Sequence, residues 1–88
     1  MAAVDRSHSK PKSKIVRDPA ILEGEPVVRG TRIPVRSIVL AAREFGGVAG
    51  ARRAYPQLGI TAVQEVLTYY DAHRPEVDRY IEENDADD

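Results

Sequence analysis

The segment that most constrains the fold of this chain spans residues 23–39 and reads EGEPVVRGTRIPVRSIV. Val27, Val28 and Ile33 are β-branched and favour strands. Gly30, which lies between them, can take the positive φ that a tight hairpin requires. Pro26 has no backbone donor, so a strand must begin there or lie at a sheet edge. The segment therefore predicts a short β-ribbon whose buried face carries Val27, Val28 and Ile33.

A two-stranded ribbon is not stable alone in water, so this one must pack on helices or pair with a second copy. A chain of 88 residues buries only about 60% of its unfolded surface. The chain has no cysteine, and disulfides cannot strengthen so small a core. Oligomerisation is the remaining means of support. We therefore expect a homodimer, with Val27, Val28 and Ile33 at its interface.

After the ribbon, the spacing of apolar residues becomes helical. Steps of 3, 4 and 3 predict a first helix that begins after Pro34 and ends at Gly46, with an inward face formed by Val35, Ile38, Ala42 and Phe45. A second helix is expected over roughly residues 48–55, with Arg52 and Arg53 turned outward. In the third helix, Thr61 is the expected N-cap and Gln64 completes a capping box.

The predicted fold is mostly α-helical with a short N-terminal β-ribbon. Pro75 suits the first turn of a fourth helix, and the second and third helices, joined by a turn containing Gly59, have helix-turn-helix proportions. Residues 1–14 are expected to form a disordered basic arm, residues 15–83 a single domain, and residues 84–88 an acidic frayed tail. The chain lacks an apolar run long enough to span a bilayer and an apolar leader, so we expect a cytoplasmic protein without membrane contact.

Charge is divided along the chain. Residues 1–53 hold eleven Lys/Arg against five Asp/Glu, a net charge of +6, whereas residues 54–88 hold two against nine, a net charge of −7. Such asymmetry is one sign of a nucleic-acid contact, and arginine, which binds phosphate well, dominates the cations. The predicted nucleic-acid-binding residues are Arg29, Arg32, Arg36, Arg52 and Arg53. Alternatively, Arg29 and Arg32 pair with Glu23 and Glu25 of a neighbouring chain.

Catalysis is not expected. His8 lies in the basic arm, and His73 is only two residues from Asp71, which places them on different faces of a helix. The C-terminal acids lack the glycine and distant glutamate of a calcium loop, and the chain has no phosphate-binding glycine motif. We therefore expect no catalytic residues, no cofactor and no metal site.

The segment RDPAILEGEPVVRGTRIPVRSIV, residues 17–39, resembles the signature of the domain of unknown function 433 family, whose pattern runs D-P-x-I-x-x-G-x-P-V-x-x-G-T-R-I-P-V. The matching residues are Asp18, Pro19, Ile21, Gly24, Pro26, Val27, Gly30, Thr31, Arg32, Ile33, Pro34 and Val35. The resemblance extends over roughly residues 15–84. The sequence departs from the family pattern in GGVAGARRAYP, residues 46–56. Members commonly have a more acidic helix here, whereas this chain has Arg52 and Arg53.

This resemblance implies a homeodomain-like, helix-turn-helix-like fold and a VapB-like antitoxin role, often beside a PIN-like ribonuclease toxin. It implies no particular DNA-contacting residues. The function it favours is that of an antitoxin which neutralises such a toxin and binds operator DNA as an autorepressor. The alternative is an interaction module or scaffold that does not touch DNA. Salt-dependent DNA binding would distinguish the two.

Overall fold

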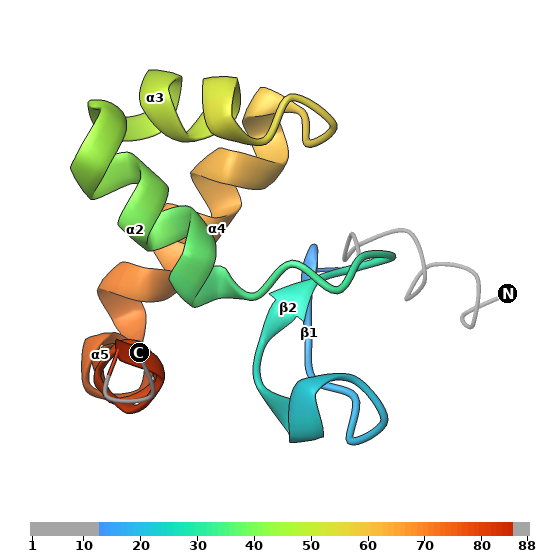
Figure 1. Cartoon of the computed structure of the whole chain (residues 1–88). Coiled ribbons are helices and arrows are strands. Elements are labelled where there is room, and N and C mark those ends of the chain that lie inside the picture. Colours follow the sequence, from blue (N-terminus) through green and yellow to red (C-terminus); the bar gives the residue numbers. More distant parts are fainter. Residues whose placement is uncertain (1–12, 86–88) are drawn as a thin grey trace, which may run out of the picture.

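The structure is a computed structural model that describes residues 13–85, apart from the side chain of the last of these. It is mostly helical with one small sheet, as the sequence predicts. The elements follow the order β1 (Ile15–Val16), a 3-10 turn η1 (Leu22–Gly24), β2 (Val27–Val28), α2 (Val35–Phe45), α3 (Gly47–Ala54), α4 (Ile60–Ala72) and α5 (Arg74–Asp85). In Figure 1, α3 lies across one end of α2 and α4, the sheet lies beside them, and α5 lies at the opposite end from α3. No helix in this part of the chain is long and apolar enough to cross a membrane.

The predicted ribbon is only partly correct. Gly30 takes a φ of 80°, and the turn closes with hydrogen bonds from Thr31 N to Val28 O at 3.0 Å and from Val28 N to Ile33 O at 2.9 Å. The strand that pairs with β2, however, is β1, with Ile15 opposite Val28. Residues after the turn form only an isolated bridge between Pro34 and Val27. The partner strand β1 lies before η1 in the sequence, and β2 follows it. The sequence did not predict this pairing, because strand formation depends on packing against neighbours that local sequence does not specify.

The predicted dimer interface needs a correction. Val27 is fully buried and Val28 is 4% exposed, and Val28 belongs to the same core cluster as Ile38 and Val63. Ile33 packs partly buried against that core. Because the helices of the same chain cover these side chains, Val27 and Val28 are not accessible to a second chain. The ribbon pairs and packs within one chain, and the dimer itself stays a prediction.

The helices α2 and α3 form where the sequence predicts them. Gly46 ends α2 in the left-handed conformation with a φ of 98°, as a C-terminal glycine does. The buried face of α2 differs in part, because Phe45 is 50% exposed and Val39 is buried in its place. This difference leaves a large aromatic side chain on the surface at the corner between α2 and α3.

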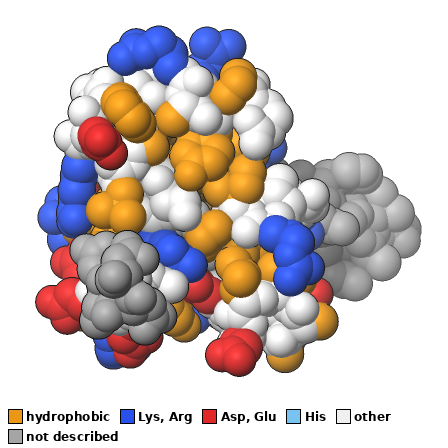
Figure 2. Space-filling model, in the orientation of Figure 1, with side chains coloured by type: hydrophobic (Ala, Val, Ile, Leu, Met, Phe, Trp, Pro, Cys, Tyr) orange, Lys and Arg blue, Asp and Glu red, His pale blue; other side chains and the backbone are white. Residues whose placement is uncertain are grey.

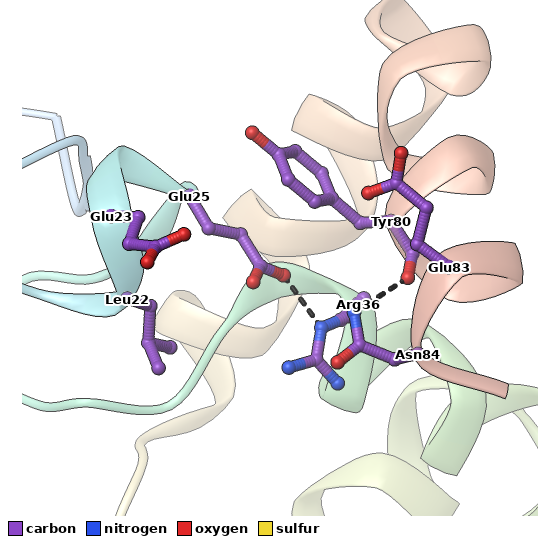
Figure 3. A pocket seen from close by; sticks show the side chains of 7 residues that line it. All are labelled: Leu22, Glu23, Glu25, Arg36, Tyr80, Glu83 and Asn84. Carbon is purple, nitrogen blue, oxygen red and sulfur yellow. Dashed lines mark hydrogen bonds and ion pairs between the residues drawn. The ribbon is translucent and has the colours of Figure 1, made fainter. Parts of the chain in front are cut away.

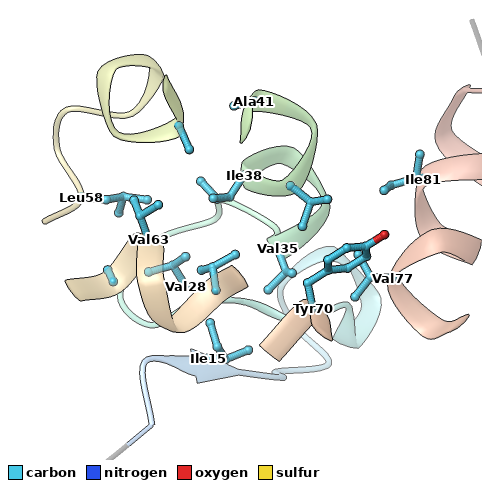
Figure 4. Close-up of a cluster of buried hydrophobic side chains, with 14 residues drawn as sticks. Ile15, Val28, Val35, Ile38, Ala41, Leu58, Val63, Tyr70, Val77 and Ile81 are labelled. Atoms are coloured by element: carbon cyan, nitrogen blue, oxygen red, sulfur yellow. The ribbon is translucent and has the colours of Figure 1, made fainter. Parts of the chain in front are cut away.

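Helix α4 begins at Ile60, and its N-cap is Gly59 without any side-chain hydrogen bond. The predicted capping box of Thr61 and Gln64 is therefore wrong, because the helix starts before Thr61. The buried face of α4 includes Val63 and Val66, both of which are fully buried. Figure 4 shows how the apolar side chains from α2, α4, α5 and the sheet meet in one cluster.

Candidate functional site

The five arginines predicted to bind nucleic acid fall into three places. Arg29 and Arg32 are exposed at the ribbon turn, Arg52 and Arg53 are exposed on α3, and Arg36 is partly buried on α2. Figure 2 shows Lys and Arg side chains over α3 and a second group beside the sheet. The four exposed arginines of the predicted set therefore lie in two places, the ribbon turn and α3, and Arg36 lies in neither.

A depression of about 270 Å³ lies between the ribbon turn and the loop that joins α3 to α4. Lys14 and Arg29 line one side, and Gln57, Gly59 and the first turn of α4 line the other. Arg29 donates from Nε and Nη2 to the carbonyl of Ser13, at 2.9 and 2.5 Å. These bonds fix the direction of the guanidinium and leave its Nη1 group for another acceptor. The depression therefore joins two cations to the α3–α4 turn.

The first turn of α4 carries no cation, but it is open. Ile60 is 43% exposed, and Thr61, Gln64 and Thr68 are exposed along one face. Glu65, the carboxylate closest in sequence to Thr61 and Gln64, accepts bonds from the hydroxyl of Ser13 and the amide of Lys14, both at 2.9 Å. Ser13 and Lys14 therefore belong to the folded domain, contrary to their predicted place in a disordered arm; residues 1–12 lie outside the described residues.

Besides Arg29, two more of the predicted arginines are held by contacts within the chain. Arg36 donates from Nε to Glu25 at 2.7 Å, and the two side chains are only 20% and 7% exposed. Arg53 donates from Nη2 to the carbonyl of Phe45 at 3.0 Å, at the C-terminal end of α2. The charge of Arg36 is thus neutralised inside the fold, which excludes it from the predicted phosphate-binding set. Arg53 remains exposed, but it is directed toward the α2–α3 corner.

A cavity of about 560 Å³ separates η1 from α5. Figure 3 shows Glu23 and Glu25 on the η1 side, Tyr80, Glu83 and Asn84 on the α5 side, and Arg36 between them. Leu22 and Glu23 both adopt positive φ, 50° and 55°, which is strained for residues with a side chain. Among the described residues, no partner binds the carboxylates of Glu23 and Glu83. Sequence reasoning missed this cavity because η1 and α5 are about sixty residues apart.

A polar contact joins the start of the chain to the α4–α5 corner. Arg17 binds Glu76 through both carboxylate oxygens, one of them at 2.7 Å, and also donates to the hydroxyl of Tyr69. Tyr69 stacks on His73 with ring centroids 4.0 Å apart. The hydrogen bond from Arg17 holds the pKa of Glu76 below its ordinary value, and burial raises the pKa of Tyr69. Sequence reasoning found no signal for this contact, because its members are more than fifty residues apart.

The lowered pKa of Glu76 predicts a pH dependence of stability. Because the carboxylate binds protons less readily in the folded chain, its contribution is fully present above its ordinary pKa of 4.5 and is lost as pH falls through the lower folded value. We expect Glu76→Gln to lower the free energy of unfolding at pH 7 and to make little difference at strongly acidic pH. Urea unfolding from pH 7 to pH 2 measures both. Glu82→Gln, a change at an exposed acid on the same helix, is the control and should change the free energy of unfolding at pH 7 by less than about 0.5 kcal/mol.

The described residues hold no group of three His, Cys, Asp or Glu side chains arranged to bind a metal ion. The hydroxyl of Ser13 donates to Glu65, and Nδ1 of His73 lies 2.9 Å from the carbonyl oxygen of Tyr69. Three surface features of the described residues are candidates for contact with a partner: the cationic depression at the α3–α4 turn, the acidic cavity beside η1, and the exposed Phe45 corner.

Comparisons with known proteins agree with this fold. Over residues 15–70, the sequence matches the model of the family described as "Protein of unknown function (DUF433)". The crystal structure of a DUF433 member protein from Anabaena variabilis superposes with a TM-score of 0.72 at 24% identity, over 91% of this chain and 78% of that one. No curated protein matches the sequence. Since the family model covers more than half of the chain and includes the ribbon, α2, α3 and most of α4, the chain belongs to the DUF433 family.

Proposed function

We propose that this protein is the antitoxin of a toxin–antitoxin pair that binds operator DNA at the α3–α4 turn and a PIN-like ribonuclease toxin at the opposite end of the fold. The observation that carries the proposal is the position of the cations. Lys14 and Arg29 border the α3–α4 turn, and Arg52 lies on α3, the helix that leads into it. In a helix-turn-helix protein, this turn and the start of the second helix are the parts closest to DNA.

Each side of the turn has a distinct part in the proposed contact. Exposed cations at Lys14, Arg29, Arg32 and Arg52 neutralise phosphates, which supplies affinity without sequence information. The first turn of α4 then approaches the groove with Thr61 and Gln64, because the acid nearest to them, Glu65, is already bound to Ser13 and Lys14. Gln64 is able to pair with adenine, since it does not cap the helix. This placement assigns phosphate contacts to the ribbon turn and base contacts to α4.

The toxin surface follows from charge. The cavity beside η1 presents the carboxylates of Glu23 and Glu83, which have no ion-pair partner among the described residues, and its lining also includes Tyr80 and Leu22. A lysine or arginine of a partner protein would place its apolar stem on Leu22 and Tyr80 and its charged end between the acids. The neighbouring gene tests this pairing. A reading frame for a PIN-like protein beside the gene for this chain would support it, and a neighbouring gene of another kind would argue against it.

The salt dependence of DNA binding tests the DNA half of the proposal. We expect Arg32→Ala combined with Arg52→Ala to weaken binding to all sequences and to flatten the slope of log K against log salt by about 2, because each lost phosphate contact removes about 0.9. Gln64→Ala should reduce the preference for operator over random DNA and leave the slope unchanged. Fluorescence anisotropy over a range of salt concentrations measures both quantities.

Arg79→Ala is the matched control, because Arg79 is an exposed arginine on α5, away from the α3–α4 turn. It should leave affinity and slope unchanged. Equal losses from Arg79→Ala and from the Arg32/Arg52 variant would show that net charge alone governs binding and would contradict the proposed surface. If the wild-type chain binds no DNA even at low salt, the interaction module that does not touch DNA becomes the better account.

A further inference from the structure

The corner between α2 and α3 exposes the largest apolar side chain that the structure leaves uncovered. Phe45 is 50% exposed, and the only other large hydrophobic residue exposed to a similar degree in residues 13–85 is Ile60. On one side of Phe45 lies a hollow of about 350 Å³, lined by Leu40, Ala41 and Tyr55 among others. On the other side lies a smaller hollow of about 250 Å³ that includes Gly50 and Ala54. An aromatic knob therefore stands between two hollows.

The rims of this surface carry opposite charges. Glu44 lines the larger hollow, and Arg53 lines the smaller one. Among the described residues Glu44 has no ion-pair partner, and Arg53 donates a single bond, from Nη2 to the carbonyl of Phe45. In Figure 2, hydrophobic side chains lie below the Lys and Arg side chains at the top of the molecule, over α3, and an acidic side chain lies next to them at the upper left. The surface thus combines a cation at Arg53, the apolar side chain of Phe45, and a hollow that is lined by apolar residues, Ser37 and the anion Glu44.

We propose that a second copy of this chain covers the α2–α3 corner in a two-fold symmetric dimer. A two-fold interface requires a patch that is complementary to itself. When the corner is rotated onto itself, Phe45 of each copy enters the larger hollow of the other, and Arg53 of each copy meets Glu44 of the other. The order of charge and shape on this surface satisfies that condition, whereas a surface with acids or cations alone would repel its own copy.

The small size of the chain also favours a second copy as the partner of the α2–α3 corner. A domain of this length has a marginal core, and the predicted support from the ribbon is absent because Val27 and Val28 are buried within one chain. The α2–α3 corner is where apolar surface remains available. The hollows beside Phe45 share no lining residue with the acidic cavity beside η1, and dimer formation does not depend on the proposed DNA or toxin binding.

Sedimentation equilibrium of the full chain tests the dimer. We expect the wild type to dimerise and Phe45→Asp to raise the dissociation constant at least a hundredfold, because the substitution removes a central aromatic contact twice per dimer. Ile60→Asp, the matched change at the other exposed hydrophobic residue, should leave it unchanged. A wild type that stays monomeric at about 100 μM, or an equal effect of both substitutions, would overturn the proposal.

Charge reversal gives a second test that does not depend on Phe45. Glu44→Arg and Arg53→Glu should each raise the dissociation constant about tenfold, because each places like charges together twice per dimer. The double variant restores opposite charges and should return the dissociation constant to within about threefold of the wild type. Failure of the double variant to recover, when circular dichroism shows that it is folded, would contradict the assigned contact.

Discussion

Replacing Gly50 with alanine is expected to destabilise the fold by about 3 kcal/mol, a large part of the roughly 5–10 kcal/mol available to a domain of this size. A Cβ atom at this position would lie 2.0 Å from the carbonyl oxygen of Phe45 and 2.2 Å from its carbonyl carbon. Both are backbone atoms, so no side-chain rotation relieves the overlap. Relief requires α3 to move away from the end of α2. Urea unfolding followed by circular dichroism measures the loss.

The sign of this effect separates packing from helix propensity. In an uncrowded helix, alanine is more favourable than glycine by roughly 0.5–1 kcal/mol, so propensity alone predicts that Gly50→Ala stabilises the protein. Gly59→Ala is the control, because nothing lies within 4 Å of a Cβ at that site and its φ of −74° suits any residue. It should change stability by less than about 1 kcal/mol. A stabilised Gly50→Ala variant would show that α2 and α3 do not approach as closely as described.

Parts of this fold are predictable from the sequence because their signals are local. The turn from α2 into α3 is encoded locally: Gly46 and Gly47 both take positive φ, at 98° and 76°, and adjacent glycines mark such a corner. Pro34 likewise precedes α2, and Pro75 lies in the first turn of α5. Each of these signals acts within a few residues, so a single sequence is enough to predict the ends of α2 and the start of α5.

Other features depend on contacts between distant segments and could not be placed. The pairing of β1 with β2 occurs across η1, and nothing in IV or VV specifies which strand each one joins. The predicted N-terminus of α4 is wrong. Thr61 and Gln64 have the spacing of a capping box, but Ile60 already lies in the helix and Gly59 is the N-cap. Phe45 fits the inward spacing of α2, but α3 packs beside that end of the helix and leaves the ring exposed.

The candidate site shows the same limit. Charge and helix periodicity placed Arg29, Arg32, Arg52 and Arg53 on the surface. They did not reveal that Arg36 lies over a buried carboxylate, because Glu25 is eleven residues away in an irregular segment. The acidic cavity was also hidden, since its two sides come from η1 and α5. The sequence thus predicts which charged side chains are exposed, whereas the structure is needed to show which charges pair with each other.

The pair of Arg36 and Glu25 should be among the most sensitive polar contacts in the protein. Glu25 is 6% exposed, and Arg36 Nε is 2.7 Å from its carboxylate. Arg36→Met leaves that carboxylate buried without its cation, and we expect a loss of about 3 kcal/mol in the free energy of unfolding. Arg74→Met is the matched substitution in an exposed pair, in which Arg74 and Asp71 are 60% and 67% exposed. It should cost less than about 1 kcal/mol.

The double variant Arg36→Met with Glu25→Met separates the cost of an orphaned charge from the value of the pair. Replacing both members removes the buried carboxylate, so we expect the double variant to regain most of the stability that Arg36→Met loses. It also tests the assignment of Arg36 to the interior, because a folded double variant should bind DNA with the wild-type salt slope. If its stability recovers and the slope flattens by about 0.9, Arg36 contacts phosphate after all, and the cationic surface extends from the ribbon turn onto α2.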